Sequence, residues 1–152
     1  MFTLVQNTPI NLSLISPLYE DREVLSRAWP EAIYPFNHEQ WTEWFKETSK
    51  VKTVSLLLKF DSDIVAHAAI KSYVIEPGLN YLCLIAVRKD LQSKGIGREF
   101  LKQIFLHCQN KLGISELYLM VHLDNQRALD FYTKLGFQWV DGENPRRLKI
   151  KL

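Results

Sequence analysis

Hydrophobic and polar positions along the chain predict a mixed order of strands and helices. Two β-rich runs, 51–60 and 64–74, flank a short acidic turn at 61–63, a spacing typical of a hairpin. The next run, 81–87, is almost continuously apolar and predicts a strand that is buried on both faces. These three runs indicate a sheet at the centre of the fold.

A helix and a further strand follow the apolar run. Between Gly97 and Leu112 the apolar residues recur at the spacing of one helical face, and Gly113 is placed to end that helix. Residues 116–121 predict the next strand. The pattern predicts one β-α-β unit in the middle of the chain.

The last part of the chain predicts one helix and two closing strands. The helix is capped by Asp124 or Asn125 and stops at Gly136. The strands, 137–140 and 147–152, are separated by turn residues.

The first third of the chain is predicted to be mainly helical. Residues 11–15 fit a short strand, and a turn at Pro17 opens a helix that reaches about Trp29. A second helix starts at Asn37, whose side chain can cap it, and ends near Thr48. The whole order of elements predicts an α+β fold.

Composition restricts the class of protein. A chain of 152 residues with 47% apolar residues fits one domain over 1–152, and the net charge of +2 gives no support for nucleic-acid binding. The longest apolar run is too short to span a bilayer, and the N-terminus has no secretory signal, so we expect a cytoplasmic protein without membrane contact. Cys83 and Cys108 lack metal-ligand spacing, and His67 and His107 are expected to be structural or exposed, so no metal site is predicted.

The segment 92–98 carries the most informative chemistry. It links the apolar strand to the helix, and Gly95 and Gly97 let its backbone approach a ligand closely. Free amides and the positive end of the helix dipole then favour a phosphate or pyrophosphate. The glycines alone fit equally well a tight turn with no ligand.

Spacing excludes two well-known phosphate loops. A dinucleotide fingerprint needs a small residue at position 100, where the chain has Phe100. A nucleotide P-loop needs Lys and then Ser or Thr after its second glycine, whereas Arg98 and Glu99 follow Gly97.

Two stretches resemble motifs of one enzyme family. Residues 87–97, VRKDLQSKGIG, resemble motif A of the Gcn5-related N-acetyltransferases (GNAT), and residues 125–137, NQRALDFYTKLGF, resemble motif B. The resemblance covers about residues 81–140. It implies a three-layer GNAT-like fold: a twisted mixed sheet of six or seven strands, splayed at its centre and flanked by about four helices.

The resemblance also implies acetyl-coenzyme A (acetyl-CoA) as co-substrate, held between the strand that ends at Val87 and the strand 116–121. The main chain of the former would pair with the pantetheine arm, the amides of 93–98 would hold the pyrophosphate, and Asn125 would bind the pantetheine end. Asn125 fits a simple helix N-cap nearly as well, and both roles are compatible. The cofactor-binding residues expected in this way are Ile85, Ala86, Val87, Gln92, Ser93, Lys94, Gly95, Ile96, Gly97, Arg98 and Asn125.

The family mechanism implied is direct transfer to a neutral amine without an acyl-enzyme. The Ile85 amide matches the family's oxyanion donor, and Tyr132 matches the acid that protonates the departing thiolate. Without motif B, a tyrosine on an apolar helix face would instead be assigned to packing.

The general base is not evident from the resemblance. The matching strand positions are Tyr81, Cys83 and Met120, none of which is a convincing base. Glu76, His122 and Asp124 are nearby alternatives that equally fit solvated or capping roles, and a water relay would also serve.

Two positions depart from the family pattern. Lys89 replaces a frequent proline and Ser93 a frequent glycine. Neither position is expected to require a positive φ.

The acceptor is expected to bind near residues 29–36 and 141–147, with Trp29, Tyr34, Phe36, Tyr81 and Cys83 as candidate contacts. Aromatic residues near prolines also fit core packing or a dimer contact, so monomer and homodimer both stay open.

The leading hypothesis is an N-acetyltransferase that acts on a primary amine of a small molecule or a peptide. A non-catalytic coenzyme A sensor and an interaction domain without cofactor are the alternatives.

Overall fold

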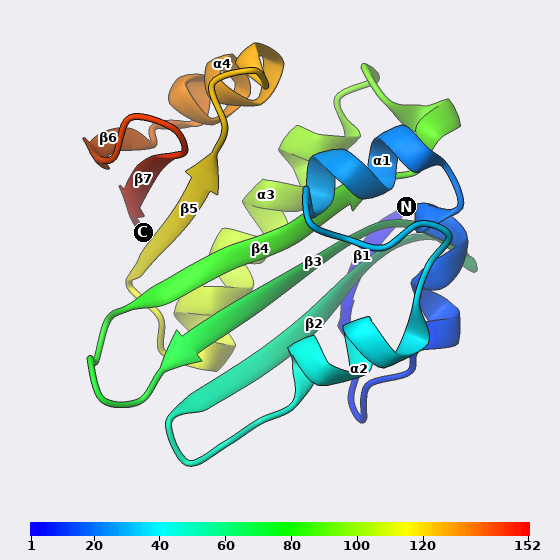
Figure 1. The fold of residues 1–152 in the computed structure, drawn as a ribbon, viewed down its shortest axis with the longest axis horizontal. Helices are drawn as coiled ribbons and strands as arrows, with labels where there is room; N and C mark the ends of the chain where they lie inside the picture. The colour runs from blue at the N-terminus through cyan, green and yellow to red at the C-terminus, as the bar shows by residue number, and fades with distance from the viewer.

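The computed structural model describes residues 1–152 and arranges them around one seven-stranded sheet with the strand order β1-β2-β3-β4-β5-β7-β6 (Figure 1). β4 and β5 are parallel, and the other neighbours are antiparallel. The strands are β1 (Phe2–Gln6), β2 (Val51–Phe60), β3 (Asp63–Tyr73), β4 (Asn80–Val87), β5 (Glu116–Val121), β6 (Gln138–Asp141) and β7 (Arg146–Lys151). The four α-helices are α1 (Arg22–Ala28), α2 (His38–Phe45), α3 (Ile96–His107) and α4 (Gln126–Leu135).

Helices cover both faces of the sheet. The side chains of a strand alternate between faces, so in β2 Leu57 belongs to the core that contains residues of α1 and α2, whereas Leu56 and Leu58 belong to the core that contains residues of α3 and α4. Figure 1 shows α1 and α2 in front of β2, β3 and β4, with α3 behind them. The predicted mixed sheet with about four helices is confirmed.

The N-terminal region differs from its prediction. Residues 11–15 are not a strand: they form a 3₁₀ turn (Leu12–Leu14) in which Asn11 Oδ1 accepts from the Ser13 amide at 3.0 Å. The first strand is β1, which the sequence analysis missed, and it pairs with β2 at the sheet edge. Asparagine readily bonds its own following backbone, and this competes with strand pairing.

Most other element ends agree with the sequence. Asn37 caps α2 through the Gln40 amide, although this helix stops at Phe45. α3 continues into a wider helical turn that ends at Gly113, and α4 ends at Gly136; both glycines are left-handed, with φ of 64° and 109°.

No helix combines the length and the apolar character that a bilayer crossing requires.

One ionisable histidine lies inside the core. His67, on β3, has no exposed surface, and both its ring nitrogens have partners, Tyr19 Oη at 2.9 Å and Ser55 Oγ at 3.0 Å. Burial lowers the pKa of His67 to about 3, and the Leu84 carbonyl opposes this shift. The expected structural role is confirmed for His67, whose ring is neutral at ordinary pH.

This buried histidine makes folding sensitive to acid. In the unfolded chain the His67 ring has a pKa near 6.5 and binds a proton below that pH. In the folded protein the ring stays unprotonated down to about pH 3. Stability should therefore fall as the pH drops below 6.5, by about 2 kcal/mol between pH 6.5 and 5 from this group. Denaturant unfolding over this range should give a steeper pH slope for the wild type than for His67→Gln. Equal slopes would contradict a neutral buried His67.

Candidate active site

β4 and β5 meet only near the start of β4. The one register pair between these parallel strands is Tyr81 with Tyr118. In Figure 1 β5 turns away from β4 beyond this point, so the predicted splay is confirmed. The rest of the β5-facing edge of β4 has no strand partner, and such an edge offers N–H and C=O groups to an extended ligand.

β4 also departs from regular pairing with β3. The register jumps between His67 and Ala69, so that Ala68 faces two residues, Leu84 and Ile85. Leu84 is buried and has a φ of 54°, in the left-handed region that non-glycine residues rarely adopt. A bulge of this kind bends the strand and increases its twist, and it lies where β4 leaves β5.

The turn after β4 is shaped to leave helix amides free. Gly95 is the N-cap of α3 with a φ of 82°, and no side chain accepts from the first turn of the helix. Gln92 Nε2 donates to the Val87 carbonyl at 3.1 Å and so ties the turn to the end of β4. Unpaired amides and the helix dipole at such a turn favour a bound anion.

Ser93 corrects an expectation about this turn. Its φ is 63°, so the position does require a positive φ, and the serine adopts the conformation without glycine's freedom. Ser93 Oγ accepts a hydrogen bond from the Arg127 guanidinium, which links the turn to α4.

A groove of about 660 Å³ runs from the bulge to the turn. Lys94 and Ile96 do not line it: Lys94 is exposed, and Ile96 is turned into the core. The other expected cofactor residues do, namely Ile85, Ala86, Val87, Gln92, Ser93, Gly95, Gly97, Arg98 and Asn125. A Cβ added at Gly95 would meet no protein atom within 4 Å, whereas one at Gly97 would lie 3.4 Å from the Phe131 ring.

α4 contributes two side chains to this groove. Asn125 caps the helix, because its Oδ1 accepts from the Ala128 amide at 3.3 Å, so the simple structural role is present. Tyr132 is 9% exposed, packs against Phe131 and Phe137, and forms no hydrogen bond within the protein. Burial raises the pKa of Tyr132, so the phenol keeps its proton at neutral pH.

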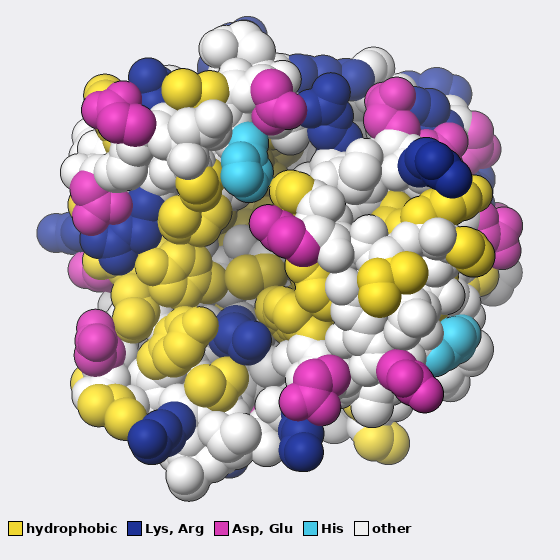
Figure 2. All heavy atoms as spheres, viewed as in Figure 1, with side chains coloured by type: hydrophobic (Ala, Val, Ile, Leu, Met, Phe, Trp, Pro, Cys, Tyr) yellow, Lys and Arg dark blue, Asp and Glu magenta, His cyan; other side chains and the backbone are white.

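A second groove of about 1070 Å³ continues past the bulge. The two grooves meet at the residues that line both, namely Glu23, Arg27, Ile85, Asn125, Ala128 and Tyr132. Figure 2 shows a hollow over β4 with hydrophobic side chains inside it and a histidine and acidic side chains on its rim. Trp29, Tyr81 and Cys83 line it, together with Met120.

Tyr34 and Phe36 lie outside this groove, contrary to expectation. Phe36 stacks on Trp41, with ring centroids 4.8 Å apart, and belongs to the core under α2. Tyr34 is exposed and donates to the Glu20 carbonyl at 3.2 Å. The loop before α2 turns these two rings away from the cleft.

The 141–147 turn supports the second groove from one end. Arg147 forms a bidentate pair with Asp141 at 2.8 and 2.6 Å and donates to Tyr81 Oη at 3.3 Å. Pro145 of the same turn lines the groove. The 141–147 turn therefore borders the second groove.

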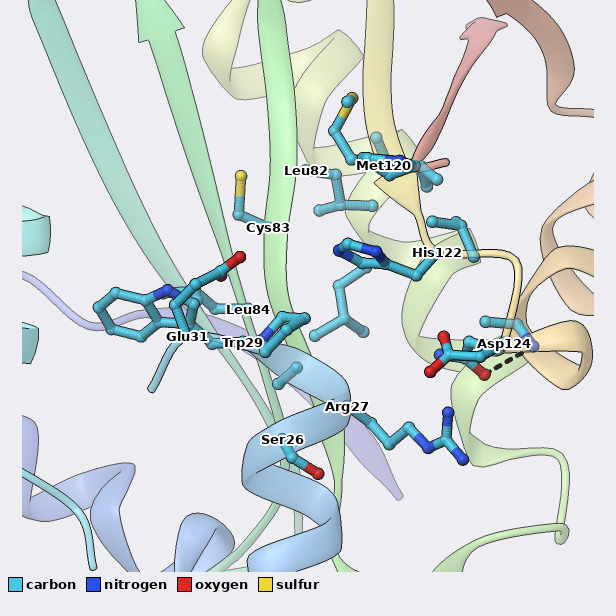
Figure 3. A pocket seen from close by; sticks show the side chains of 18 of the residues that line it. Ser26, Arg27, Trp29, Glu31, Leu82, Cys83, Leu84, Met120, His122 and Asp124 are labelled. Carbon is cyan, nitrogen blue, oxygen red and sulfur yellow. Dashed lines mark hydrogen bonds between the residues drawn. The ribbon is translucent and has the colours of Figure 1, made fainter. Parts of the chain in front are cut away.

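Candidate proton acceptors approach the groove from loops. In Figure 3 His122 extends from the end of β5 toward β4, while Glu31 lies on the opposite side near Cys83. Asp124 also lines the groove, whereas Glu76 lies in the distant turn between β3 and β4.

The family assignment follows from comparison with known proteins. The family model described as "Acetyltransferase (GNAT) family" matches residues 21–137. The chain belongs to this family. It is 26% identical over 116 residues to N-alpha-acetyltransferase 30 of Schizosaccharomyces pombe, a match that covers 74% of this chain and 69% of that protein.

Two further similarities agree with this assignment. The chain is 26% identical over 112 residues to L-amino acid N-acetyltransferase AaaT of Escherichia coli, covering 69% of this chain and 64% of that protein. Its fold matches the crystal structure of PaiA N-acetyltransferase from Thermoplasma acidophilum in complex with coenzyme A, with a TM-score of 0.69, 18% identity, and coverage of 100% and 99%. The chain thus spans about two thirds of the curated relatives and the whole fold of the structural one.

Several groove residues of this GNAT acetyltransferase were missed by the sequence analysis. The second groove is also lined by Arg27 of α1, Glu31 of the loop after α1, and Trp44 of α2. They lie 36 to 53 positions before the start of β4 in the chain, and no motif marks them. The tertiary packing of the N-terminal layer, including that of α1 against β4, brings them to the site.

Cys83 is the one thiol in the grooves of this GNAT acetyltransferase, and its environment disfavours the thiolate. Burial raises the pKa of Cys83 to about 12, although the Lys71 ammonium nearby partly offsets this. Because the thiolate is the reactive form, this side chain is poorly suited to accept an acyl group or a proton near neutral pH. The geometry is consistent with direct transfer.

The protonated state of Cys83 is directly testable. At pH 8 the thiolate fraction, and with it the rate of alkylation by iodoacetamide, should be about 1000-fold below that of an unperturbed thiol. The Cys108→Ala variant leaves Cys83 as the only thiol, and mass spectrometry follows its modification. Alkylation at the rate of a free peptide cysteine would contradict the raised pKa.

Proposed function

We propose that this protein transfers the acetyl group of acetyl-CoA directly to a primary amine of a small molecule or a peptide. The observation that carries the proposal is the meeting of two grooves at Ile85 and Tyr132, one leading to an anion-binding turn and the other to an apolar cleft. A reaction between two bound substrates needs this arrangement, because both must reach one point from opposite sides.

The first groove fits the chemistry of acetyl-CoA. The amides of the turn at 93–98 and the Arg98 and Arg127 guanidiniums suit a diphosphate. The unpaired edge of β4 at 85–87 suits a chain with alternating amide donors and acceptors such as pantetheine. When bound, acetyl-CoA supplies an activated thioester.

The residues at the junction have distinct roles in this proposal. The Ile85 amide donates a hydrogen bond to the oxygen on which negative charge develops. The Tyr132 hydroxyl, kept protonated by burial, gives its proton to the departing sulfur. Placement of the two substrates supplies much of the remaining rate.

The second groove is suited to an amine carried on an apolar group. Trp29, Tyr81 and Met120 form its apolar walls, and Glu31 and His122 lie on opposite sides of the cleft (Figure 3). Either side chain, directly or through water, is suitably located to take a proton from the incoming amine. One relative named as an N-alpha-acetyltransferase and another named as an L-amino acid N-acetyltransferase support a primary amine as the acceptor.

One observation favours a second function. The strand positions from which a base would project carry Tyr81, Cys83 and Met120, and the Cys83 thiol holds its proton up to about pH 12. A coenzyme A sensor without turnover would need no base at these positions. Turnover with any amine separates the two functions.

A panel of primary amines tests the proposal. We expect amine-dependent release of the coenzyme A thiol with at least one amino acid or with a peptide that has a free N-terminus, followed by thiol colorimetry and product mass. Binding of acetyl-CoA without release across the panel would favour the sensor, and no binding would refute both.

Tyr132→Phe tests the proposed acid. The kcat should fall about 10²- to 10⁴-fold, while the dissociation constant of acetyl-CoA stays nearly constant, because the hydroxyl acts mainly in the transition state. Tyr73→Phe is the control, since Tyr73 lies in the turn region at the end of β3 and outside both grooves. Equal kcat values for Tyr132→Phe and wild type would remove Tyr132 from the mechanism.

Gly95→Val tests the anion-binding turn. A valine at a φ of 82° is strained, and its side chain would project into space that no protein atom fills, so we expect acetyl-CoA binding to be lost in calorimetry. Gly113→Val is the matched control: its φ is 64° and its Cβ also meets no atom within 4 Å, but it lies at the far end of the helix. Loss of affinity in both variants, or in neither, would contradict the assigned turn.

A further inference from the structure

A line of buried polar side chains crosses the core to the bulge in β4. Asn7 Nδ2 lies 3.3 Å from Ser55 Oγ, and Ser55 Oγ lies 3.0 Å from His67 Nε2. His67 Nδ1 lies 2.9 Å from Tyr19 Oη, which lies 2.7 Å from the Leu84 carbonyl oxygen. All four side chains are at most 6% exposed.

The direction of every hydrogen bond in this line follows from its last member. A carbonyl oxygen only accepts, so the single Tyr19 proton points to Leu84. His67 Nδ1 must then donate to Tyr19 Oη, which leaves Nε2 without a proton and able to accept from Ser55 Oγ.

The far end of the line is consistent with this direction. Asn7 Nδ2 has two protons and donates one to Ser55 Oγ and the other to the Asn11 carbonyl, while Asn7 Oδ1 accepts from the Asn11 amide. All the hydrogen bonds from Asn7 to His67 Nε2 thus point in the same direction, toward His67, and those from His67 Nδ1 continue toward Leu84. Hydrogen bonds aligned in this way strengthen one another. Burial holds the pKa of His67 at about 3, so the ring stays neutral and the line stays intact across the working pH.

The line ends on a strained peptide. Leu84 is a buried leucine with a φ of 54°, and neither it nor Ile85 has a register partner on β3. A conformation of this kind costs free energy and persists only where its surroundings hold it. The Tyr19 hydroxyl provides such a restraint, because a buried carbonyl without a donor is itself unfavourable.

Restraint of this carbonyl also fixes the amide that follows. The Leu84 C=O and the Ile85 N–H belong to one planar trans peptide group, so they point in opposite directions. With the carbonyl directed to Tyr19 in the core under α1 and α2, the Ile85 N–H is directed away from that core.

We propose that Tyr19 and His67 are positioning residues that set the orientation of the 84–85 peptide and thereby aim the Ile85 amide into the junction of the two grooves. This inference rests on the proposed function, in which the Ile85 amide is the oxyanion donor. Neither side chain lines either groove, so both act through the backbone.

The first test does not depend on activity. Nitrogen-15 NMR of the His67 ring in the full-length protein should show a protonated Nδ1 and an unprotonated Nε2. The opposite tautomer would overturn the donor line. In the crystal structure of Tyr19→Phe, the φ of Leu84 should leave the left-handed region or the 84–85 peptide should rotate, and an unchanged peptide would overturn the positioning role.

The second test measures catalysis with an amine found active in the panel. Tyr19→Phe should lower kcat about 10- to 100-fold with less than about a threefold change in acetyl-CoA affinity, because an oxyanion donor is misplaced while the phosphate turn is intact. Ile104→Val, which shortens a buried side chain of α3, is the control for lost stability. Its melting temperature should be comparable to that of Tyr19→Phe, whereas its kcat should match that of the wild type. Wild-type kcat in Tyr19→Phe would overturn the inference.

Two further cases bear on the inference: a Tyr19→Phe variant that does not fold, and a wild type that has no activity. If Tyr19→Phe does not fold, Ser55→Ala replaces it. This variant removes the donor to His67 Nε2, so we expect a mixture of His67 tautomers and a several-fold lower kcat. An unchanged tautomer together with an unchanged kcat would overturn the inference. If the wild type acetylates no amine, the proposed function fails by itself, while the tautomer and the 84–85 peptide still decide whether the line controls the bulge.

Discussion

The bend of β4 at Leu84 is the constraint on which the rest of the structure depends. A parallel pair that stayed in register along β4 and β5 would satisfy all its backbone groups internally and leave no edge for a ligand. The pairing of β4 with β5 is limited to Tyr81, the bulge follows at Leu84 and Ile85, and the strand then leads into the turn from which α3 begins. The bulge thus lies between the closed part of the sheet and the turn with the free helix amides.

The two grooves are built from different materials. The first groove offers backbone groups, at the strand edge 85–87 and at the helix amides after Gly95, together with side chains of α1 and α4. The second groove is lined by residues that arrive from α1, α2, β4, β5 and the 141–147 turn. A backbone site depends on the fold and suits one conserved chemical group, whereas a side-chain site changes with each substitution. This division is why the family assignment says much about the acetyl donor and little about the amine.

The same division explains what could be predicted from the sequence. The cofactor turn was visible because backbone geometry requires particular residues, and Gly95 indeed has the positive φ that only glycine adopts easily. The positive φ of Ser93 was not predicted, because the residue type serine does not indicate this conformation. Glu31 and Tyr34 lie in one loop, yet only Glu31 lines the groove. The loop path depends on Phe36, which stacks on Trp41 of α2, and no local pattern reveals this contact. Strand β1 was missed for a related reason: at a sheet edge, pairing with β2 decides the structure more than the local pattern does.

The N-terminal layer connects the two sides of the site. Tyr19 contacts the Leu84 carbonyl from the turn just before α1, and α1 with its following residues places Arg27 and Trp29 in the acceptor groove. The core under α1 and α2 is close-packed around Trp41 and His67, so a shift of α1 cannot be absorbed there without moving its neighbours. The wall that α1 gives to the second groove and the Tyr19 hydroxyl that binds the Leu84 carbonyl therefore rest on the same packed core.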